Sequence, residues 1–342
     1  MLGRLKEAGL RVARGLGAGR LVRDSQWRTE RLLILCYHGI SLQDEHRWSS
    51  LYVTEDLFRR RLRALKEGGF NVLPLDDAVS RLAAGTLPPR SVVITFDDGF
   101  YDFFALAYPV LLEFGFHATV YLATYYCFLP YPVFDPLVSY LMWRGPGRRI
   151  ELPGLLDAAV TIPSDETARN ALYAHIRTTA QTRKTDAEEK QRLARSLAGE
   201  VGVDFDALMA RRVFQLMNPG EVGSLDGRLV SIQLHTHRHR TPRDRALFLR
   251  EIADNRAAIL KIRPKEGELR HFCYPSGVHD PVFLPWLEEA GVVSATTCDL
   301  QLVSRATHPL VMPRLLDSMH VSDTVFDGWL TGIAAFVPQR RS

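Results

Sequence analysis

One stretch decides how this sequence is interpreted: Ser91-Val92-Val93-Ile94-Thr95-Phe96-Asp97-Asp98-Gly99. Its first six residues are mostly apolar and β-branched, which is typical of a strand buried on both faces in a parallel sheet or barrel. The chain then changes abruptly to two neighbouring carboxylates and a glycine. In parallel β/α folds, functional groups gather where the strands end. We therefore expect Asp97 and Asp98 at the rim of such a sheet.

Strand and helix patterns alternate on both sides of this stretch, which indicates repeated β-α units. The alternation is lost between residues 126 and 217, where an aromatic, proline-rich start precedes mostly helical patterns. We predict an α/β fold with three parts: a basic N-terminal segment (1–29), a barrel-like domain (30–125 and 218–325) and a mainly helical insertion (126–217). The expected strands are 32–37, 70–73, 91–96, 118–123, 229–234, 269–274, 292–296 and 310–313. The principal expected helices are 54–68, 75–84, 101–114, 243–262 and 281–290.

Composition narrows the class of protein. Hydrophobic residues make up 46% and charged residues 24% of the 342, which is ordinary for a soluble globular enzyme. The net charge is only +4, and six of the basic residues lie within positions 1–23. A nucleic-acid-binding surface is therefore not expected. The four cysteines are scattered without a Cys-x-x-Cys pair, so we expect buried free thiols in a reducing compartment.

The N-terminal segment leaves two interpretations open. No run of about 18 apolar residues is present, and Arg11 and Arg14 interrupt what would be the core of a signal peptide. We therefore expect a cytoplasmic protein. One face of a helix would carry Leu2, Leu5, Val12 and Leu16, and the opposite face Arg4, Arg11 and Arg14. Such a helix, within residues 1–23, either contacts the inner membrane surface peripherally or docks on its own protein.

Histidines follow the predicted strand 229–234, in His235-Thr236-His237-Arg238-His239. Imidazoles at i and i+4 after a strand can present two nitrogens to one ion. Together with an aspartate they make a two-histidine, one-carboxylate site that leaves room for water and substrate. Two adjacent carboxylates need a cation or a shared proton, so one aspartate of Asp97-Asp98 can bind the ion while the other accepts a proton.

These motifs resemble the polysaccharide deacetylase family (NodB homology, carbohydrate esterase family 4). Thr95-Phe96-Asp97-Asp98-Gly99 matches the family's first motif, and the segment from His235 to His239 matches its His-(Ser/Thr)-x-x-His motif. The resemblance implies a distorted (β/α) barrel that removes acetyl groups from N-acetylated sugars. It implies Asp97 as general base, Thr236 as a supporting or substrate-facing hydroxyl, and Asp98, His235 and His239 as metal ligands.

The remaining motifs depart from the common pattern. Phe272-Cys273-Tyr274-Pro275-Ser276-Gly277 resembles a Phe-x-Tyr-Pro-x-Gly variant subgroup and lacks the usual arginine. We expect Arg314 to orient Asp97 instead, and the backbone N–H of Ser276 to face the oxyanion. Two histidines are candidates for the general acid: His38, after the first buried strand, and His320, near the last one.

The predicted activity is hydrolysis of acetamide groups on a saccharide or glycoconjugate, releasing acetate. The metal is expected to be Zn²⁺, with Co²⁺, Ni²⁺, Fe²⁺ and Mn²⁺ as alternatives. Two other functions stay open: hydrolysis of another non-peptide C–N or ester bond, and inactive saccharide binding. The aromatic residues that begin the insertion, from Tyr125 to Trp143, either flank a sugar groove or pack the inserted helices. The sequence leaves the oligomeric state open.

Overall fold

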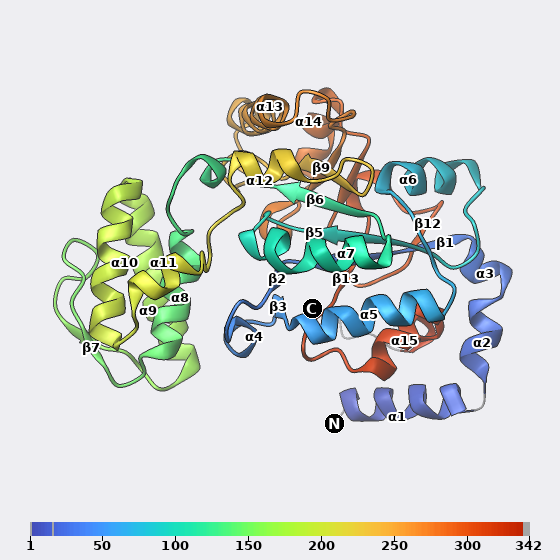
Figure 1. Ribbon diagram of the computed structural model, residues 1–342, viewed down its shortest axis with the longest axis horizontal. Helices are drawn as coiled ribbons and strands as arrows, with labels where there is room; N and C mark the ends of the chain where they lie inside the picture. Colours follow the sequence, from blue (N-terminus) through green and yellow to red (C-terminus); the bar gives the residue numbers. More distant parts are fainter. Residues whose placement is uncertain (1, 16, 338–342) are drawn as a thin grey trace.

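A curled parallel sheet forms the centre of the protein (Figure 1), for which a computed structural model describes residues 2–15 and 17–337. Its strands lie in the order β1-β5-β6-β9-β10-β11, each parallel to its neighbour. They are β1 (Arg31–Tyr37), β5 (Ser91–Phe96), β6 (Ala118–Leu122), β9 (Val230–Leu234), β10 (His271–Cys273) and β11 (Ser294–Thr296). All six residues of β5 are buried, as the apolar pattern of the sequence predicts.

The segment after β11 connects the two edges of this sheet. Met312 pairs with Thr296 of β11, and β13 (Leu315–Leu316) pairs in parallel with β1. The predicted strand 310–313 is therefore wrong in position. Leu310 and Val311 belong to a 3-10 turn that begins at Pro309, where the Val311 N–H is donated to His308 O, so in this stretch Met312 is the residue that joins the ladder on β11. The consequence is a distorted, barrel-like curl that brings Arg314 between the first and last strands.

Shorter strands complete the sheets. β12 (Val303–Ser304) runs antiparallel to the start of β1, and β4 (Asn71–Val72) pairs with the start of β5. Two further pairs lie outside this sheet. They are β2 (Gly39–Ile40) with β3 (Tyr52–Val53), and β7 (Arg149–Ile150) with β8 (Val160–Thr161).

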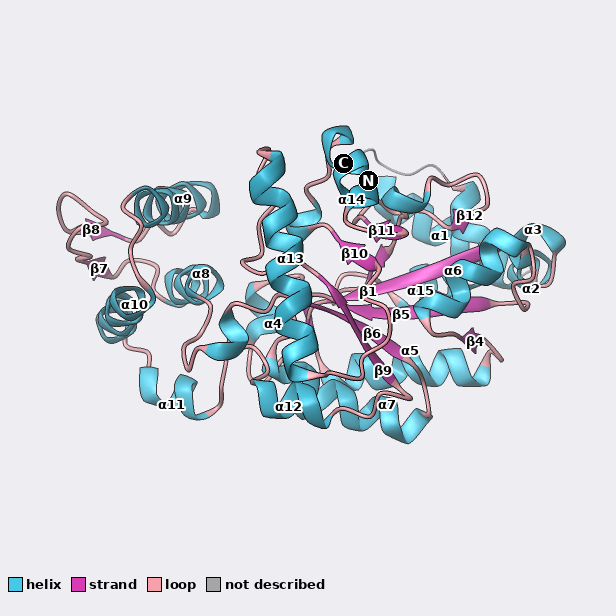
Figure 2. Ribbon diagram, turned by 90° about the horizontal axis from the view of Figure 1, so that it is seen from above, coloured by secondary structure: helices cyan, strands magenta, loops and turns pink. Residues whose placement is uncertain are grey.

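Helices cover the outside of the curled sheet (Figures 1 and 2). Thr54 begins α5 (Glu55–Glu67) by accepting the Leu57 N–H on its side chain, and Asn218 with Glu221 forms a capping box at α12 (Pro219–Ser224). The predicted helix 101–114 is divided into a wider turn, Phe103–Ala107, and α7, because Pro109 has no N–H for the preceding turn. The helices are α4 (Glu45–Trp48), α5 (Glu55–Glu67), α6 (Leu75–Ala84), α7 (Tyr108–Phe114), α12 (Pro219–Ser224), α13 (Arg245–Ile262), α14 (Leu284–Glu289) and α15 (Asp323–Thr331).

The helices between residues 126 and 217 gather on one side of the barrel (Figure 2). They are α8 (Phe134–Arg144), α9 (Glu166–Thr182), α10 (Ala187–Val201) and α11 (Phe205–Ala210). An aromatic cluster attaches them to the barrel: the ring of Trp48 lies 5.9 Å from that of Tyr140 and 5.3 Å from that of Phe214. The hydroxyl of Tyr140 donates to Asp44 at 2.6 Å. Tyr140 therefore packs the inserted helices and does not flank a groove.

Three helices precede the barrel: α1 (Leu2–Gly15), α2 (Ala18–Arg23) and α3 (Gln26–Thr29). Leu10 of α1 is buried and packs near Gly328 of α15, whereas Val12 is 62% exposed. The side chains of Leu2, Arg4, Leu5 and Arg14, and all of Leu16, lie outside the described residues, so the predicted apolar stripe stays a prediction. Within residues 2–15 and 17–337, no helix is long and apolar enough to span a membrane.

Candidate metal and catalytic site

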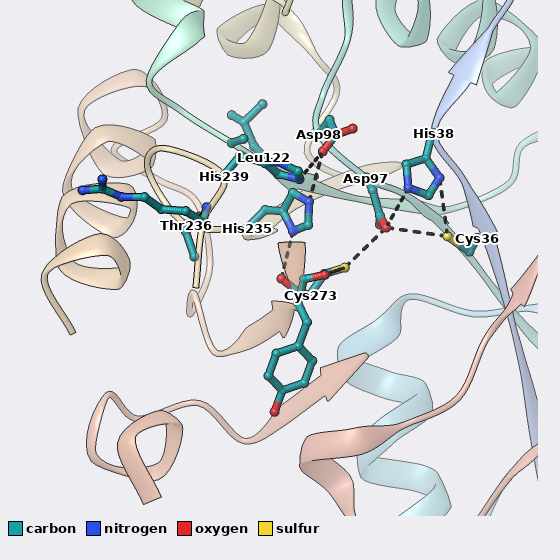
Figure 3. A network of polar contacts seen from close by, with 12 residues as sticks. Cys36, His38, Asp97, Asp98, Leu122, His235, Thr236, His239 and Cys273 are labelled. Carbon is teal, nitrogen blue, oxygen red and sulfur yellow. Dashed lines mark hydrogen bonds and ion pairs between the residues drawn. The ribbon is translucent and has the colours of Figure 1, made fainter. Parts of the chain in front are cut away.

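Loops at the ends of β1, β5, β9 and β10 bring polar side chains together at one rim of the barrel (Figure 3). β6 lies between β5 and β9 in the sheet, so the loop after β5 must pass closely over its end. Gly99 allows this passage. It has a φ of 84°, and a Cβ there would lie 2.2 Å from Leu122 Cδ1. A larger residue at position 99 would displace the loop that carries both aspartates.

Asp98 is the meeting point of two imidazoles. Its Oδ1 lies 3.1 Å from His235 Nε2 and 3.0 Å from His239 Nε2 (Figure 3). Asp98 and His239 both have left-handed backbones, with φ of 69° and 53°. Such conformations cost free energy in residues other than glycine, and they cluster at functional sites. The local backbone is thus shaped to aim these three side chains at one point.

The hydrogen bond on the other side of His235 tests whether a metal ion fits here. His235 Nδ1 lies 2.8 Å from the backbone oxygen of Cys273, and a carbonyl oxygen can only accept. Nδ1 therefore carries the hydrogen, and in the neutral ring Nε2 presents a lone pair to the Asp98 carboxylate. Two acceptors facing each other require a cation or a second ring proton between them. A divalent ion fits this donor set of one carboxylate and two imidazoles.

A buried network holds the histidine loop. Asn255 of α13 accepts the His235 N–H at 3.0 Å and donates to Leu122 O and Thr124 Oγ1, both at 2.9 Å. Thr124 Oγ1 in turn lies 2.8 Å from His237 Nδ1. Thr236 is fully buried, and its hydroxyl accepts the Arg240 N–H. Of the two roles implied for Thr236, its position is that of a supporting residue.

Asp97 makes its shortest contacts with a different group, although one of its carboxylate oxygens also lies within 4.8 Å of a His235 ring nitrogen. Arg314 Nη1 and Nη2 each donate at 2.7 Å to one of its carboxylate oxygens, in a bidentate pair that is almost fully buried. Arg314 is itself held by the Thr297 backbone oxygen at 2.9 Å and by Thr95 Oγ1 at 3.1 Å. The structure therefore places Arg314 against Asp97, where the sequence analysis expects it.

The two neighbouring carboxyl groups remain ionised for different reasons. Burial by itself raises the pKa of Asp97, but the charge and hydrogen bonds of Arg314 outweigh burial and hold that pKa below its usual range. Burial also raises the pKa of Asp98, and there the two imidazoles, His239 first, hold it well below its usual range. Each aspartate thus has partners of its own that favour its ionised form, so the two do not have to share a proton.

The two candidate acids lie in different surroundings. His38 Nε2 is 3.6 Å from Asp97 Oδ2, and its side chain is only 14% exposed. His320 lies in an exposed turn, with its backbone N–H donated to Ser318 Oγ. The geometry therefore brings His38 to the aspartates. Ser276 lies in the turn after β10 with a φ of 58°, next to Gly277 at 67°.

Several residues around the site were not singled out from the sequence. Asn255 is one, and its signal was available: a polar residue on the apolar face formed by Phe248, Ile252 and Ile259 of α13. The cysteines are others. Cys36 and Cys273 lie 3.6 and 3.4 Å from Asp97 Oδ2. The prediction of four buried thiols is wrong for Cys298, which is exposed because it lies in the loop after β11.

A cavity of about 250 Å³ lies between the start of the insertion and the start of α10. Tyr125 connects it to the site, because its N–H donates to His237 O at 2.8 Å and its ring lies 5.7 Å from the His237 ring. Its walls combine aromatic rings with polar groups, and Gln191 Oε1 is buried there without a hydrogen-bond partner. The residues that line the cavity include Tyr125, Tyr126, Tyr131, Phe134, Lys190 and Gln191.

Comparison with known proteins gives a partial sequence match. No family model matches the chain. A segment of 103 residues is 36% identical to YxkH of Bacillus subtilis (strain 168), a protein assigned to the polysaccharide deacetylases. The segment covers 29% of this chain and 35% of that relative, so the chain matches only about a third of the relative's length.

Solved structures resemble the whole fold. The deacetylase PplD of Streptococcus pyogenes superposes with a TM-score of 0.56 at 18% identity, over 90% of this chain and 99% of its own. IcaB of Ammonifex degensii gives 0.54 at 17%, over 90% and 97%. A polysaccharide deacetylase of Bacillus cereus gives 0.56 at 15%, over 88% and 69%. These matches confirm the predicted distorted barrel, and the segment shared with YxkH bears out the resemblance to the polysaccharide deacetylases. The Phe-x-Tyr-Pro subgroup stays a prediction.

Proposed function

We propose that this chain, which shares the fold of the polysaccharide deacetylases and part of the sequence of one, hydrolyses acetamide groups on N-acetylated saccharides. The observation that carries the proposal is the convergence of His235 and His239 on Asp98, with the His235 tautomer fixed by the Cys273 carbonyl. Such a donor set, beside a separate carboxylate, supports hydrolysis better than binding alone. A binding module has no use for a free base there.

Asp98, His235 and His239 would hold a divalent ion. Zn²⁺ is the first candidate because it accepts mixed nitrogen and oxygen ligands, and Co²⁺, Ni²⁺, Fe²⁺ and Mn²⁺ are the alternatives. When bound, such an ion supplies Lewis-acid polarisation of the acetamide carbonyl and makes water a better nucleophile near neutral pH. The buried network of Asn255, Thr124 and Thr236 fixes the ligand orientation in advance.

The residues of the chain divide the remaining chemistry. Asp97 accepts the proton of the attacking water, and Arg314 keeps its carboxylate ionised and oriented. Ser276 contributes its backbone N–H to the developing oxyanion. His38, 3.6 Å from Asp97, donates a proton to the departing amine. His320 is the less favoured acid because it lies in an exposed turn.

The cavity beside His237 supports a saccharide as substrate. Aromatic rings offer apolar faces to the C–H groups of a sugar, and the unpartnered Gln191 Oε1 needs a hydroxyl donor. A neighbouring sugar unit bound there would lie next to the histidine loop. We therefore favour an oligosaccharide or glycoconjugate over a single N-acetylated sugar.

Release of acetate from N-acetylglucosamine oligomers by the Zn²⁺-loaded protein tests the proposal directly. Asp97→Asn should abolish turnover and leave the metal content intact, whereas Asp98→Asn should lose both. Release from another amide or from esters alone would favour the alternative hydrolase. Metal and saccharide binding with no turnover on any of these substrates would identify a binding protein.

A further inference from the structure

A thiol, an imidazole and a carboxylate converge beside the candidate metal site, at the ends of β1 and β5 (Figure 3). Cys36 Sγ lies 3.6 Å from Asp97 Oδ2 and 3.9 Å from His38 Nδ1. His38 Nε2 lies 3.6 Å from the same carboxylate oxygen. One ligand atom of each residue lies within 4.8 Å of the ligand atoms of the other two. None of the three residues belongs to the donor set proposed above for the first ion.

The spacing of these three groups suits a small divalent ion. In a tetrahedral zinc site, bonds of about 2.0–2.3 Å hold the ligand atoms about 3.3–3.8 Å apart. The two separations from Asp97 Oδ2 fall in that range, and the one between Cys36 and His38 is only slightly longer. His38 faces the thiol with one ring nitrogen and the carboxylate with the other, so a small rotation of the ring aims a single nitrogen at the ion. Thiolate, imidazole and carboxylate together form a donor set for Zn²⁺.

The ion would take the place of the Cys36 thiol proton, which points toward Asp97 Oδ2. Arg314 Nη2 donates to that oxygen at 2.7 Å, and a carboxylate oxygen has a second lone pair. Cys273, the other thiol beside this oxygen, has an alternative acceptor in Tyr274 O at 3.8 Å. When the ion binds, the S–H bond of Cys36 breaks, the proton passes to the solvent, and a sulfur lone pair forms the bond to the ion.

We propose that Cys36, His38 and Asp97 form a second site for Zn²⁺, weaker than the first, and that its occupation stops turnover. The second ion would engage Asp97 and His38, the two residues that accept and donate protons in the proposed mechanism. Neither could then exchange a proton with water or with the departing amine. The effect on turnover rests on the proposed function, whereas the binding of a second ion does not.

Charge makes this site the weaker of the two. The Arg314 guanidinium donates to both oxygens of Asp97 at 2.7 Å, and it stays charged. The first ion would also be a near neighbour, because a carboxylate oxygen of Asp97 lies within 4.8 Å of a His235 ring nitrogen. Like charges a few ångströms apart repel, so we expect the second site to fill only after the first, at a free Zn²⁺ concentration at least about tenfold higher.

Burial distinguishes this cluster from a chance group of polar side chains on the surface. Cys36 is fully buried and Asp97 nearly so, whereas the side chain of His38 is 14% exposed. An incoming ion therefore meets His38 first and exchanges its water for the two buried ligands. Cys36 itself neither accepts nor donates a proton in the proposed mechanism, so its role is regulatory and not catalytic.

Zinc K-edge X-ray absorption of the full chain, loaded with one and then two equivalents of Zn²⁺, tests the second site directly. The first site contains no sulfur, so we expect a sulfur neighbour at about 2.3 Å only when the second equivalent is bound. Cys36→Ser should lose this sulfur signal. Cys298→Ser, which removes an exposed thiol, and Cys127→Ser, which removes a buried thiol near Ala123 O, should keep it. No sulfur in the wild type at two equivalents, or a signal that survives in Cys36→Ser, would overturn the proposal.

Acetate release measured against free Zn²⁺ supplies the second readout. The wild type should be activated by the first equivalent and lose its turnover as the second site fills, with recovery when a chelator lowers free Zn²⁺ again. In Cys36→Ser the concentration for half-inhibition, relative to that variant's own maximum, should be at least about tenfold higher, and Cys127→Ser should match the wild type. A second ion bound through sulfur without inhibition would overturn the effect on turnover. If the wild type releases no acetate at any Zn²⁺ concentration but shows the Cys36-dependent sulfur signal, the proposed function fails and the second site stands.

Discussion

The two halves of the candidate site begin from the same dipeptide, Asp97-Asp98, and differ in their hydrogen-bond partners. Asp98 faces the imidazoles of His235 and His239, whose nitrogens toward the carboxylate can carry either a proton or a metal ion. Asp97 faces a guanidinium that stays charged, with thiols around it and one more imidazole at 3.6 Å. Adjacent residues in a strand-end turn point in different directions. The difference teaches that one turn can give two adjacent carboxylates separate partners, as the proposed division into a metal ligand and a proton acceptor requires.

Removal of the Asp98 carboxylate should have the largest effect. Asp98→Asn leaves two imidazoles without an anionic partner, so we expect metal content to fall to trace levels and kcat to drop by about 10⁴-fold or more. Elemental analysis measures the metal content, and acetate release measures kcat. Asp77→Asn is the matched control, since Asp77 forms an exposed pair with Arg81 on α6. If Asp98→Asn kept its full metal content, Asp98 would not be a required metal ligand and the proposed difference between the two aspartates would fail.

Replacement of Asp97 should separate binding from turnover. Asp97→Asn keeps the shape but cannot accept a proton, so kcat should fall by about 10²- to 10⁴-fold while metal content remains that of the wild type. Steady-state kinetics and elemental analysis on the same sample check this. A variant that loses its metal would show that the two carboxylates act as a unit.

The Asp97–Arg314 pair should contribute to stability as well. Arg314→Met leaves a buried carboxylate without its partner, which is expected to lower the free energy of unfolding by about 3–5 kcal/mol. Arg314→Lys keeps the charge but not the bidentate geometry. It should therefore lower the free energy of unfolding by less than Arg314→Met does, while kcat should still fall. Urea denaturation measures the free energy of unfolding of both variants, and steady-state acetate release measures kcat. Arg81→Met, at an exposed pair, should change stability by less than about 1 kcal/mol.

The smallest effect is expected outside both halves, in the aromatic cavity. Tyr131→Ala should raise KM for an N-acetylated oligosaccharide by about 2- to 10-fold with kcat unchanged, because one ring supplies about 0.5–1.5 kcal/mol. KM for the single sugar should not move. Phe128→Ala, which removes an exposed ring of the same segment, is the control. Equal KM values for all three proteins would exclude the cavity as a sugar site.

Sequence reasoning found the barrel because its strands are continuous apolar runs bounded by glycines and caps, and such patterns are local. Thr54 begins α5 where a helix is expected from residue 54, and Gly85 ends α6, which is expected over residues 75–84. It misplaced the last strand because whether residues 310–313 or 315–316 pair depends on which edges of a curled sheet meet there. That is a long-range property, which no local pattern records.

By itself, the sequence determined the identity of the Asp-Asp and His-x-x-x-His groups and their position after buried strands, because both follow from short-range patterns. Only the tertiary structure decided which partner each of these groups contacts. It aimed Asp98 at the histidines and Asp97 at Arg314, brought His38 to Asp97 while His320 lies in an exposed turn, and placed Cys36, Cys273 and Cys298 around the Asp97–Arg314 pair. The physical reason is closure of the curled sheet, which joins residues more than 200 positions apart in the chain at one rim.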